Sequence, residues 1–428
     1  MAAAPVQYRL TPSEPPQEGA RPFAWHPVSA AAFYEQYHGH PEEMLPHVHQ
    51  ALRESGKRSM IFFAGDSSLD NKHWLWPGAK TEAALVDPRE VARPRFTAPA
   101  CNGYERVLAP PRMILDVSYW VNRLCSERAP WMACLNTAVE ATTLGSRECC
   151  GLKDHDVFIS ENITQEDFLV VSVGGNDVAL APSVSTICNM LSLVCCTSRS
   201  CVEKQGCYCG GGWTCPGCTC CCWKAGSCGC GWPPGLGHFV LMFRWRIQAY
   251  IERIVGRLPR KPKKVLVCMI YFPDEEAGGS WADATLSALG YNTNPRKLQT
   301  IIRKVFELAT SQIRLKGTEV VPVPLFHVLD GSDSRDYDNR VEPSAEGGAK
   351  MAEAILQAVL ALPQNENPVT ASAIGHHLYD PLATTSYSDS PQIPAADLCM
   401  DMLLAWVGSV MDLYWPRTTY GEGMNQES

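Results

Sequence analysis

The stretch SMIFFAGDSS, residues 59–68, joins an apolar run to a short polar segment. Its first part, SMIFFA at 59–64, is almost continuously apolar and does not alternate with polar residues. Three later runs share this character: FLVVSV at 168–173, VLVCMIY at 265–271 and VVPVPLF at 320–326. Continuous apolar runs are typical of central strands in a parallel sheet that helices cover on both faces.

Helical patterns separate these runs. Residues 29–55, 239–258, 294–313 and 344–362 carry apolar side chains at roughly helical spacing. Asn294 precedes a proline, and Ser344 stands where a helix N-cap is expected. Strands that alternate with helices predict an α/β fold with a doubly wound, mainly parallel sheet, in a flavodoxin-like three-layer arrangement.

The composition excludes several classes of protein. The 428 residues are 46% hydrophobic and 19% charged, as in an ordinary globular protein. A net charge of −8 gives no basic field for nucleic acid. The apolar stretch 402–415 is shorter than the roughly 20 residues that a spanning helix needs, and residues 1–25 lack a secretory apolar region. We therefore expect a cytoplasmic protein without a membrane span.

The organisation along the chain predicts one elaborated domain over residues 26–362. A flexible N-terminal arm, 1–25, precedes it, and a C-terminal extension with a short helix, 363–428, follows it. Two insertions are expected within the domain. One, at about 71–131, is rich in tryptophan and proline, and the other, at 195–232, is rich in cysteine.

The cysteine-rich insertion holds twelve of the 20 cysteines in the chain. The pair Cys215 and Cys218 has zinc-knuckle spacing, and Cys207 and Cys209 complete the best four-ligand set for Zn²⁺. A low-complexity insertion without metal is the alternative, and a disulfide knot would require an oxidising compartment. The chemistry expected of the rest of the chain requires no cofactor.

Polar residues follow the first two apolar runs, where ligands bind in open parallel sheets. Gly-Asp-Ser ends at Ser67, and a serine on a tight turn after a strand can act as a nucleophile. Gly-Gly-Asn-Asp follows the second run, and the Asn176 amide could donate to a developing oxyanion. Helix capping by Asp66 or Ser67 and a plain glycine–asparagine turn are the structural alternatives.

Two further segments extend this pattern: NTAVEATT at 136–143 and NRVEPSAEG at 339–347. In this order the four motifs resemble the SGNH (GDSL-type) hydrolases, over residues 59 to about 362 without the insertions. The resemblance implies hydrolysis of an ester through an acyl-serine at Ser67. It also implies that backbone N–H groups of Ser67 and Ala141 join Asn176 as oxyanion donors, with Ala141 standing where the family usually has glycine.

The sequence departs from the family at the general base. Glu342 occupies the usual histidine position, and Asn339 occupies the position of the supporting aspartate. A carboxylate with an ordinary pKa near 4.3 accepts a serine proton poorly at neutral pH, although burial would raise that pKa. Histidines elsewhere are alternative bases: His327, just past the last strand, and also His73, His238, His376 and His377.

Three hypotheses follow. The first is a serine esterase or lipase-type hydrolase acting on a small-molecule ester. The alternative is a catalytically degenerate SGNH-like scaffold that binds a ligand or partner through its inserted segments. The third is a metal-binding protein centred on the cysteine-rich insertion. Nothing in the sequence indicates a nucleic-acid partner or an oligomeric state.

Overall fold

A five-stranded sheet forms the centre of the molecule. The structure is a computed structural model that describes residues 26–75, 97–148, 151–210 and 230–361. The strand order is β11-β10-β7-β2-β6, and every neighbouring pair is parallel. This confirms the predicted mainly parallel α/β sheet. The strands are β2 (Ser59–Gly65), β6 (Met132–Asn136), β7 (Phe168–Ser172), β10 (Lys264–Met269) and β11 (Glu319–Pro324).

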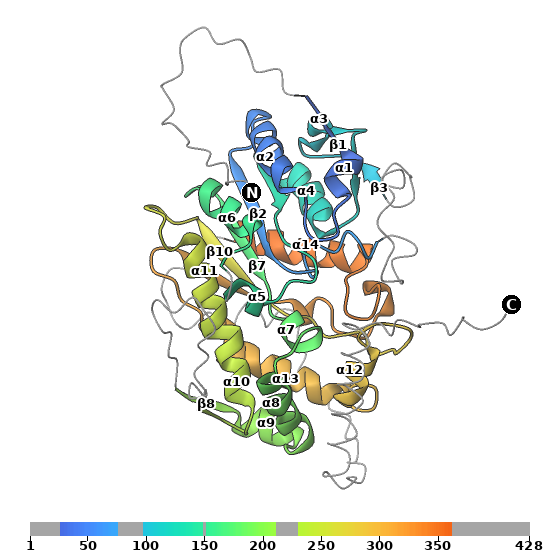
Figure 1. Cartoon of the computed structure of the whole chain (residues 1–428), viewed down its shortest axis with the longest axis vertical. Helices are drawn as coiled ribbons and strands as arrows, with labels where there is room; N and C mark the ends of the chain where they lie inside the picture. Colours follow the sequence, from blue (N-terminus) through green and yellow to red (C-terminus); the bar gives the residue numbers. More distant parts are fainter. Residues whose placement is uncertain (1–25, 76–96, 149–150, 211–229, 362–428) are drawn as a thin grey trace, which may run out of the picture.

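Alternate side chains of each strand point to opposite faces, and each face is covered by helices. Phe62 and Val171 pack on one face, whereas Ile61 and Val170 pack on the other. The result is a three-layer sandwich (Figure 1). The first layer contains α2 (Leu45–Glu54), α6 (Asp154–Asn162), α11 (Ile247–Val255) and α13 (Pro295–Leu308); the second contains α4 (Val117–Arg128) and α14 (Ala345–Leu360).

The order of the strands places a crevice between β2 and β7. The chain passes from β2 to β6 on one side, and then continues through β7, β10 and β11 on the other side. The connections therefore reverse direction at the carboxyl ends of β2 and β7. Ligands bind in open α/β sheets at this kind of reversal. Ser67 and Asn176 follow these two strands directly.

The four predicted strands are all present, but the sequence did not predict β6. Its five residues, MACLN, include few of the β-branched and aromatic residues that mark strands. It is nevertheless buried along its whole length. The helix before it, α4, lies in the stretch assigned to the first insertion, yet it packs against α14 over the sheet.

The predicted helices occur with changed boundaries. The stretch 29–55 is divided into α1 (Ala30–Tyr34), η1 (Glu42–Met44) and α2, because Gly39 adopts a positive φ and Pro41 follows it. The stretch 239–258 begins earlier, and a π-helical segment interrupts it. Ser344 caps α14 as predicted, since its hydroxyl accepts a hydrogen bond from the Gly347 N–H at 3.1 Å.

The remaining described elements are short and lie around the sheet. They are β1 (Val28–Ser29), β3 (Thr97–Pro99), α3 (Tyr104–Val107), β4 (Leu108–Ala109), β5 (Arg112–Ile114), α5 (Leu144–Glu148), α7 (Asn176–Ala179), α8 (Val184–Cys195), α9 (Arg199–Gln205), β8 (Cys207–Gly210), β9 (Cys230–Trp232), α10 (Leu236–Val240), η3 (Leu241–Arg246), α12 (Asp283–Ala288), η4 (Thr310–Gln312), η5 (Leu325–His327) and η6 (Ser334–Asp336).

Several predicted segments lie outside the described residues. These are the N-terminal arm at 1–25, the C-terminal extension at 363–428 and most of the cysteine-rich insertion. None of the helices in the described ranges is long and apolar enough to cross a membrane.

Gly65 ends β2 where a side chain has no room. A Cβ atom built on Gly65 would stand 1.8 Å from the Ser172 carbonyl oxygen, so β2 and β7 would have to separate. We predict that Gly65→Ala lowers the free energy of unfolding by about 2 kcal/mol or more, the upper part of the usual range for overpacking. Urea denaturation measures this change. Gly278→Ala is the control, because a Cβ there meets nothing within 4 Å; equal stability of the two variants would contradict the prediction.

Candidate functional site

The turn after β2 presents Ser67 at the crevice. The Asp66 N–H continues the pairing with β7 by donating to the Ser172 carbonyl oxygen at 3.1 Å. The Asp66 carboxylate in turn accepts hydrogen bonds from the Ser68 N–H at 3.1 Å and the Ser68 hydroxyl at 2.8 Å. Asp66 therefore braces the turn, while the Ser67 side chain lines a cavity.

Asn176 is the first residue of α7 and lines the same cavity. Its side-chain amide donates to the Thr142 carbonyl oxygen at 3.0 Å, which fixes the orientation of the amide plane. A primary amide carries two N–H groups, so Asn176 has a second one for a ligand. The structure therefore brings Ser67 and Asn176 to one cavity, as the resemblance implied.

Asp177, the next residue, holds the neighbouring loop. Its carboxylate accepts hydrogen bonds from the backbone N–H groups of Leu144 at 2.6 Å and Gly145 at 3.0 Å, at the start of α5. A carboxylate at this place satisfies N–H groups that have no partner within the helix. The segment at 136–143 is thereby fixed relative to α7.

Ala141 adopts a left-handed backbone conformation with φ of 56°. This conformation is uncommon for residues other than glycine, which explains why glycine is usual at the matching position of the resembling family. Hydrogen bonds on either side fix the strained residue: the Glu140 N–H donates to Asp70 at 3.1 Å, and the Thr142 hydroxyl donates to the Val139 carbonyl oxygen at 2.6 Å.

Glu342 is 2% exposed and also lines the cavity. Asn71, shortly after Ser67, donates to the Pro343 carbonyl oxygen at 2.9 Å and so holds the two segments together. Burial raises the pKa of Glu342 to about 8, although the nearby Ser67 hydroxyl opposes the shift. Its Oε2 atom has no hydrogen-bond partner of regular geometry among the described residues.

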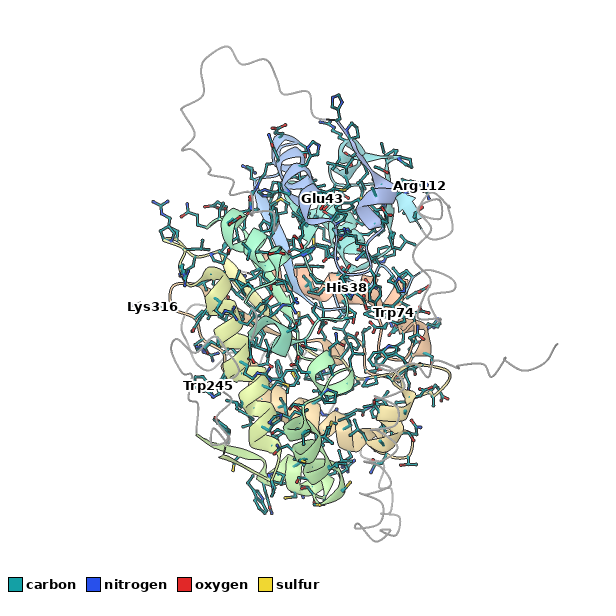
Figure 2. The ribbon with its side chains drawn as sticks, in the orientation of Figure 1. His38, Glu43, Trp74, Arg112, Trp245 and Lys316 are labelled. Carbon is teal, nitrogen blue, oxygen red and sulfur yellow. The ribbon has the colours of Figure 1, made fainter. Side chains whose placement is uncertain are left out.

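A second buried carboxyl group, that of Glu140, lies beside Glu342. Burial raises its pKa well above the ordinary value, and the charges of Glu342 and Asp70 raise it further. The Trp74 indole donates to one carboxyl oxygen at 2.8 Å, and the His38 ring contacts the Glu140 carbonyl oxygen at 3.0 Å. Figure 2 labels His38 and Trp74 near each other in the middle of the molecule.

Sequence reasoning missed Glu140, although it quoted the segment that contains it. Two neighbouring carboxylates in an apolar interior repel each other, so one of them holds a proton at neutral pH. The available signal was an acidic residue, Glu140, among small and apolar neighbours in a predicted oxyanion loop.

A buried ion pair supports this loop. Lys72 donates to both carboxylate oxygens of Asp70, at 2.7 and 2.8 Å, and both side chains are almost fully buried. Asp70 also accepts from the Gly39 N–H at 3.0 Å, which brings the N-terminal segment to the site. In the sequence, Asp70 and Lys72 stand two positions apart shortly after Ser67, and this spacing could have indicated the ion pair.

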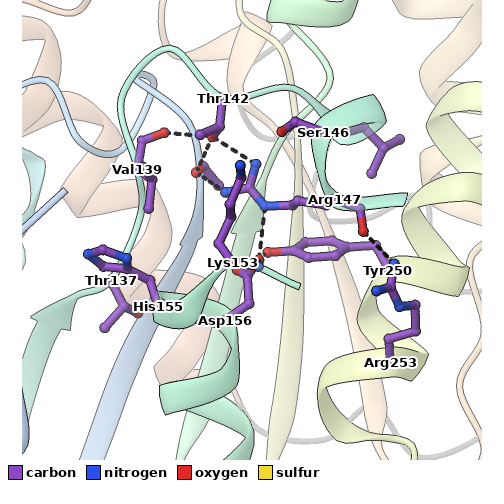
Figure 3. A network of polar contacts seen from close by, with 12 residues as sticks. Thr137, Val139, Thr142, Ser146, Arg147, Lys153, His155, Asp156, Tyr250 and Arg253 are labelled. Atoms are coloured by element: carbon purple, nitrogen blue, oxygen red, sulfur yellow. Dashed lines mark hydrogen bonds and ion pairs between the residues drawn. The ribbon is translucent and has the colours of Figure 1, made fainter. Parts of the chain in front are cut away.

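Arg147 joins the turn after β2 to the segment at 136–143 (Figure 3). This fully buried guanidinium donates to the Gly65 carbonyl oxygen and to the Thr142 hydroxyl, each at 2.7 Å. Asp156 balances its charge at 3.1 Å and accepts a further hydrogen bond from Tyr250 at 2.5 Å. Arg147 was not singled out in the sequence, where it stands as one arginine in a short helical segment.

The structure places the candidate histidines away from the cavity. His327 lies in η5, after β11, and β7 and β10 separate β11 from β2. The ring of His238 contacts the Thr186 hydroxyl at 3.1 Å, and the ring of His73 packs edge-on against Tyr37. Burial lowers the pKa of both His73 and His238 to about 4. Among the described residues, no histidine lines the cavity; His376 and His377 lie outside those residues.

Asn339, at the family's supporting aspartate position, makes a backbone contact. Its carbonyl oxygen accepts a hydrogen bond from the Ser280 hydroxyl at 2.6 Å, and its φ is 89°. Its side-chain Nδ2 is buried without a hydrogen-bond partner in the described ranges, so it does not support the Glu342 carboxyl group.

The proposed zinc ligands fall mostly beyond the described residues. Cys207 begins β8, and Cys209 lies in the same strand with its side chain undescribed. Cys215 and Cys218 lie outside the described ranges. Within those ranges, no group of three or more histidine, cysteine, aspartate or glutamate residues could hold a metal ion. A zinc site therefore stays a prediction.

The cavity has a volume of about 140 Å³. Its lining includes the polar residues Ser67, Asn176, Glu342 and Asp66. Apolar side chains from α8, α10, η3, α12 and α13 line most of the remainder.

Comparisons with known proteins give a distant likeness. No protein-family model matches the chain, and no curated protein matches it in sequence. The acetyl xylan esterase Axe2 from Geobacillus stearothermophilus is 12% identical, over 73% of this chain and 99% of that one, with a TM-score of 0.34. A catalytic mutant of Axe2 is 11% identical over the same shares with the same TM-score. A further variant is 12% identical over 71% and 95%, again at 0.34. These values assign no activity to this chain.

The raised pKa of Glu342 makes the free energy of unfolding dependent on pH. Between the ordinary pKa of 4.5 and the folded value of about 8, the folded chain binds the extra proton, so the stability of the wild type falls as pH rises through this window. Glu342→Gln cannot ionise at this position. We therefore predict that its free energy of unfolding, relative to that of the wild type, is higher at pH 9 than at pH 6. Urea denaturation at both pH values measures the difference.

Glu353→Gln is the matched control for this measurement. Arg128 lowers the pKa of Glu353, so this carboxyl group is ionised in both states above pH 6 and its replacement shifts stability equally at the two pH values. A constant difference between Glu342→Gln and the wild type would contradict the prediction.

Proposed function

We propose that the chain is a serine esterase that cleaves an ester bond through an acyl-serine at Ser67. The main support is one observation: the Ser67 hydroxyl, the Asn176 amide and the buried Glu342 carboxyl group meet at one cavity. This cavity lies where the strand connections reverse, between β2 and β7.

The reaction would proceed in two halves. The Ser67 oxygen attacks the carbonyl carbon while its proton passes to ionised Glu342, and the carbonyl oxygen becomes an oxyanion. The Asn176 amide and the backbone N–H groups of Ser67 and Ala141 would stabilise that charge. Protonated Glu342 then gives its proton to the leaving alkoxide, which departs as an alcohol and leaves the acyl-serine.

Water completes the cycle. Glu342, ionised again, takes a proton from a water molecule that attacks the acyl-serine carbonyl carbon, and the same donors stabilise the second oxyanion. Collapse of this intermediate breaks the bond to Ser67, and the proton on Glu342 returns to the serine oxygen. The products are the alcohol and the carboxylic acid.

Glu342 suits the role of base because of its surroundings. A base works best when its pKa lies near the working pH, and burial raises the pKa of Glu342 toward this range. The charge of Glu342 raises the pKa of the neighbouring Glu140, so Glu140 holds its proton while Glu342 is ionised. A carboxylate in this environment can replace the more usual imidazole.

Hydrolysis of p-nitrophenyl acetate tests the serine and its oxyanion donor. We predict that Ser67→Ala abolishes activity above background, and that Asn176→Ala lowers kcat by about 10²–10³-fold, the usual effect of losing one such donor. Ser126→Ala, which removes an exposed hydroxyl on α4, serves as the control and keeps wild-type activity. Full activity in Ser67→Ala would contradict the mechanism.

The pH profile tests the base. Only ionised Glu342 can accept the serine proton, so its raised pKa predicts that kcat/KM rises with pH and levels off above an apparent pKa near 8. Glu342→Gln should remove both this rise and most of the activity. A profile that rises near pH 6 and survives in Glu342→Gln would instead indicate a histidine base. Absence of hydrolysis in every variant, wild type included, would favour the binding-scaffold alternative.

A further inference from the structure

We infer that the ester substrate carries a saturated hydrocarbon chain of about eight carbons or more, which occupies the apolar part of the cavity beside Ser67. The inference rests on the proposed function and adds the class of substrate: a lipid-type ester rather than an acetylated sugar or another small polar ester.

The lining of the cavity supports this class. Apart from polar residues that include Ser67, Asn176 and Glu342, the walls are built from aliphatic and aromatic side chains of helices that gather in the lower part of Figure 1. A polar alcohol or a sugar ring would leave its hydroxyl groups without partners on such walls. Representative lining residues are Met190, Leu193, Phe243, Leu286, Ile302 and Val305.

The size of the cavity excludes a good fit for an acetyl group. Its volume of about 140 Å³ is roughly ten times the smallest volume that holds one water molecule. A methylene group is similar in size to a water molecule, so an acetyl group would leave most of this space unfilled. An apolar cavity of this kind holds water poorly and favours an apolar occupant.

The position of the cavity connects it to the chemistry. Gly174 and Gly175 lie between β7 and Asn176, and a Cβ atom on Gly174 would stand 3.1 Å from the Phe243 ring. The oxyanion donor Asn176 and the apolar wall at Phe243 are therefore in close contact through this backbone. A chain lying along Phe243 would have its ester group beside Ser67 and Asn176.

Two series of esters test the inference and identify the side that carries the chain. The first is the set of p-nitrophenyl esters from acetate to dodecanoate, and the second is the set of acetate esters from ethyl to dodecyl alcohol. Burying one methylene corresponds to about a fourfold gain, so kcat/KM should rise about fourfold per carbon in one series until the cavity is filled. A rise in the first series assigns the acyl chain, and a rise in the second assigns the alcohol.

Variants that narrow the cavity provide a second test of the inference. Met190→Phe and Leu286→Phe, on α8 and α12, should lower the ratio of kcat/KM for the octanoate ester to kcat/KM for the acetate ester. Val184→Phe is the matched control, because Val184 lies on α8 but is 77% exposed, and it should keep the wild-type profile. If both cavity variants fold and keep the wild-type slope, the inference is overturned.

The outcomes separate this inference from the proposed function. Hydrolysis of the acetate esters with no gain in either series would overturn the inference and leave the esterase function standing. If no ester is cleaved, the proposed function fails, and calorimetric binding of octan-1-ol to the wild type then decides the inference. Saturable binding that Met190→Phe weakens and Val184→Phe does not would support it, whereas no binding would overturn it.

Discussion

The contact between Gly65 and Ser172 is the constraint on which the candidate site depends. Because the backbones approach too closely for a Cβ atom, β2 and β7 stay paired to their last residues, and the two following turns begin at the same level. Arg147 fixes the Gly65 carbonyl oxygen from the other side and connects it to Thr142, whose carbonyl oxygen orients Asn176. The turn that carries Ser67, the segment at 136–143 and the Asn176 amide are thereby held by one set of backbone contacts.

Burial of acidic groups is the second general feature of this region. Asp66, Asp116, Glu140 and Glu342 are all buried, and burial is the largest cause of the raised pKa of each. Lys72 balances one further carboxylate, that of Asp70. In such surroundings a glutamate acquires the proton affinity that imidazole has in water. The environment of Glu342 therefore decides its proton affinity more than its residue type does.

The sequence was sufficient for four of the five strands of the central sheet and for the turns that follow two of them. Continuous apolar runs indicate buried strands of a parallel sheet. Gly-Asp-Ser is a local motif, and its position directly after such a run can be seen in the sequence. The short strand β6 was missed, since Met, Ala and Cys carry little strand preference and its burial depends on distant helices.

The parts of the site that were missed depend on contacts between distant segments. Glu140 becomes a neighbour of Glu342 only through tertiary packing, and Arg147 acquires its role from carbonyl groups that no local pattern identifies. The raised pKa of Glu342 is likewise a property of the cavity around it, and residue type alone assigns it the ordinary value.

The hydrogen bond from Asn71 to the Pro343 carbonyl oxygen joins positions 272 residues apart in the chain. Ser67 is therefore synthesised well before Glu342, whose carboxyl group lines the same cavity. A growing chain that has not reached residue 342 therefore holds Ser67 without this carboxyl group. On the proposed function, the serine would gain its base only after the segment that carries Glu342 packs against the turn after β2.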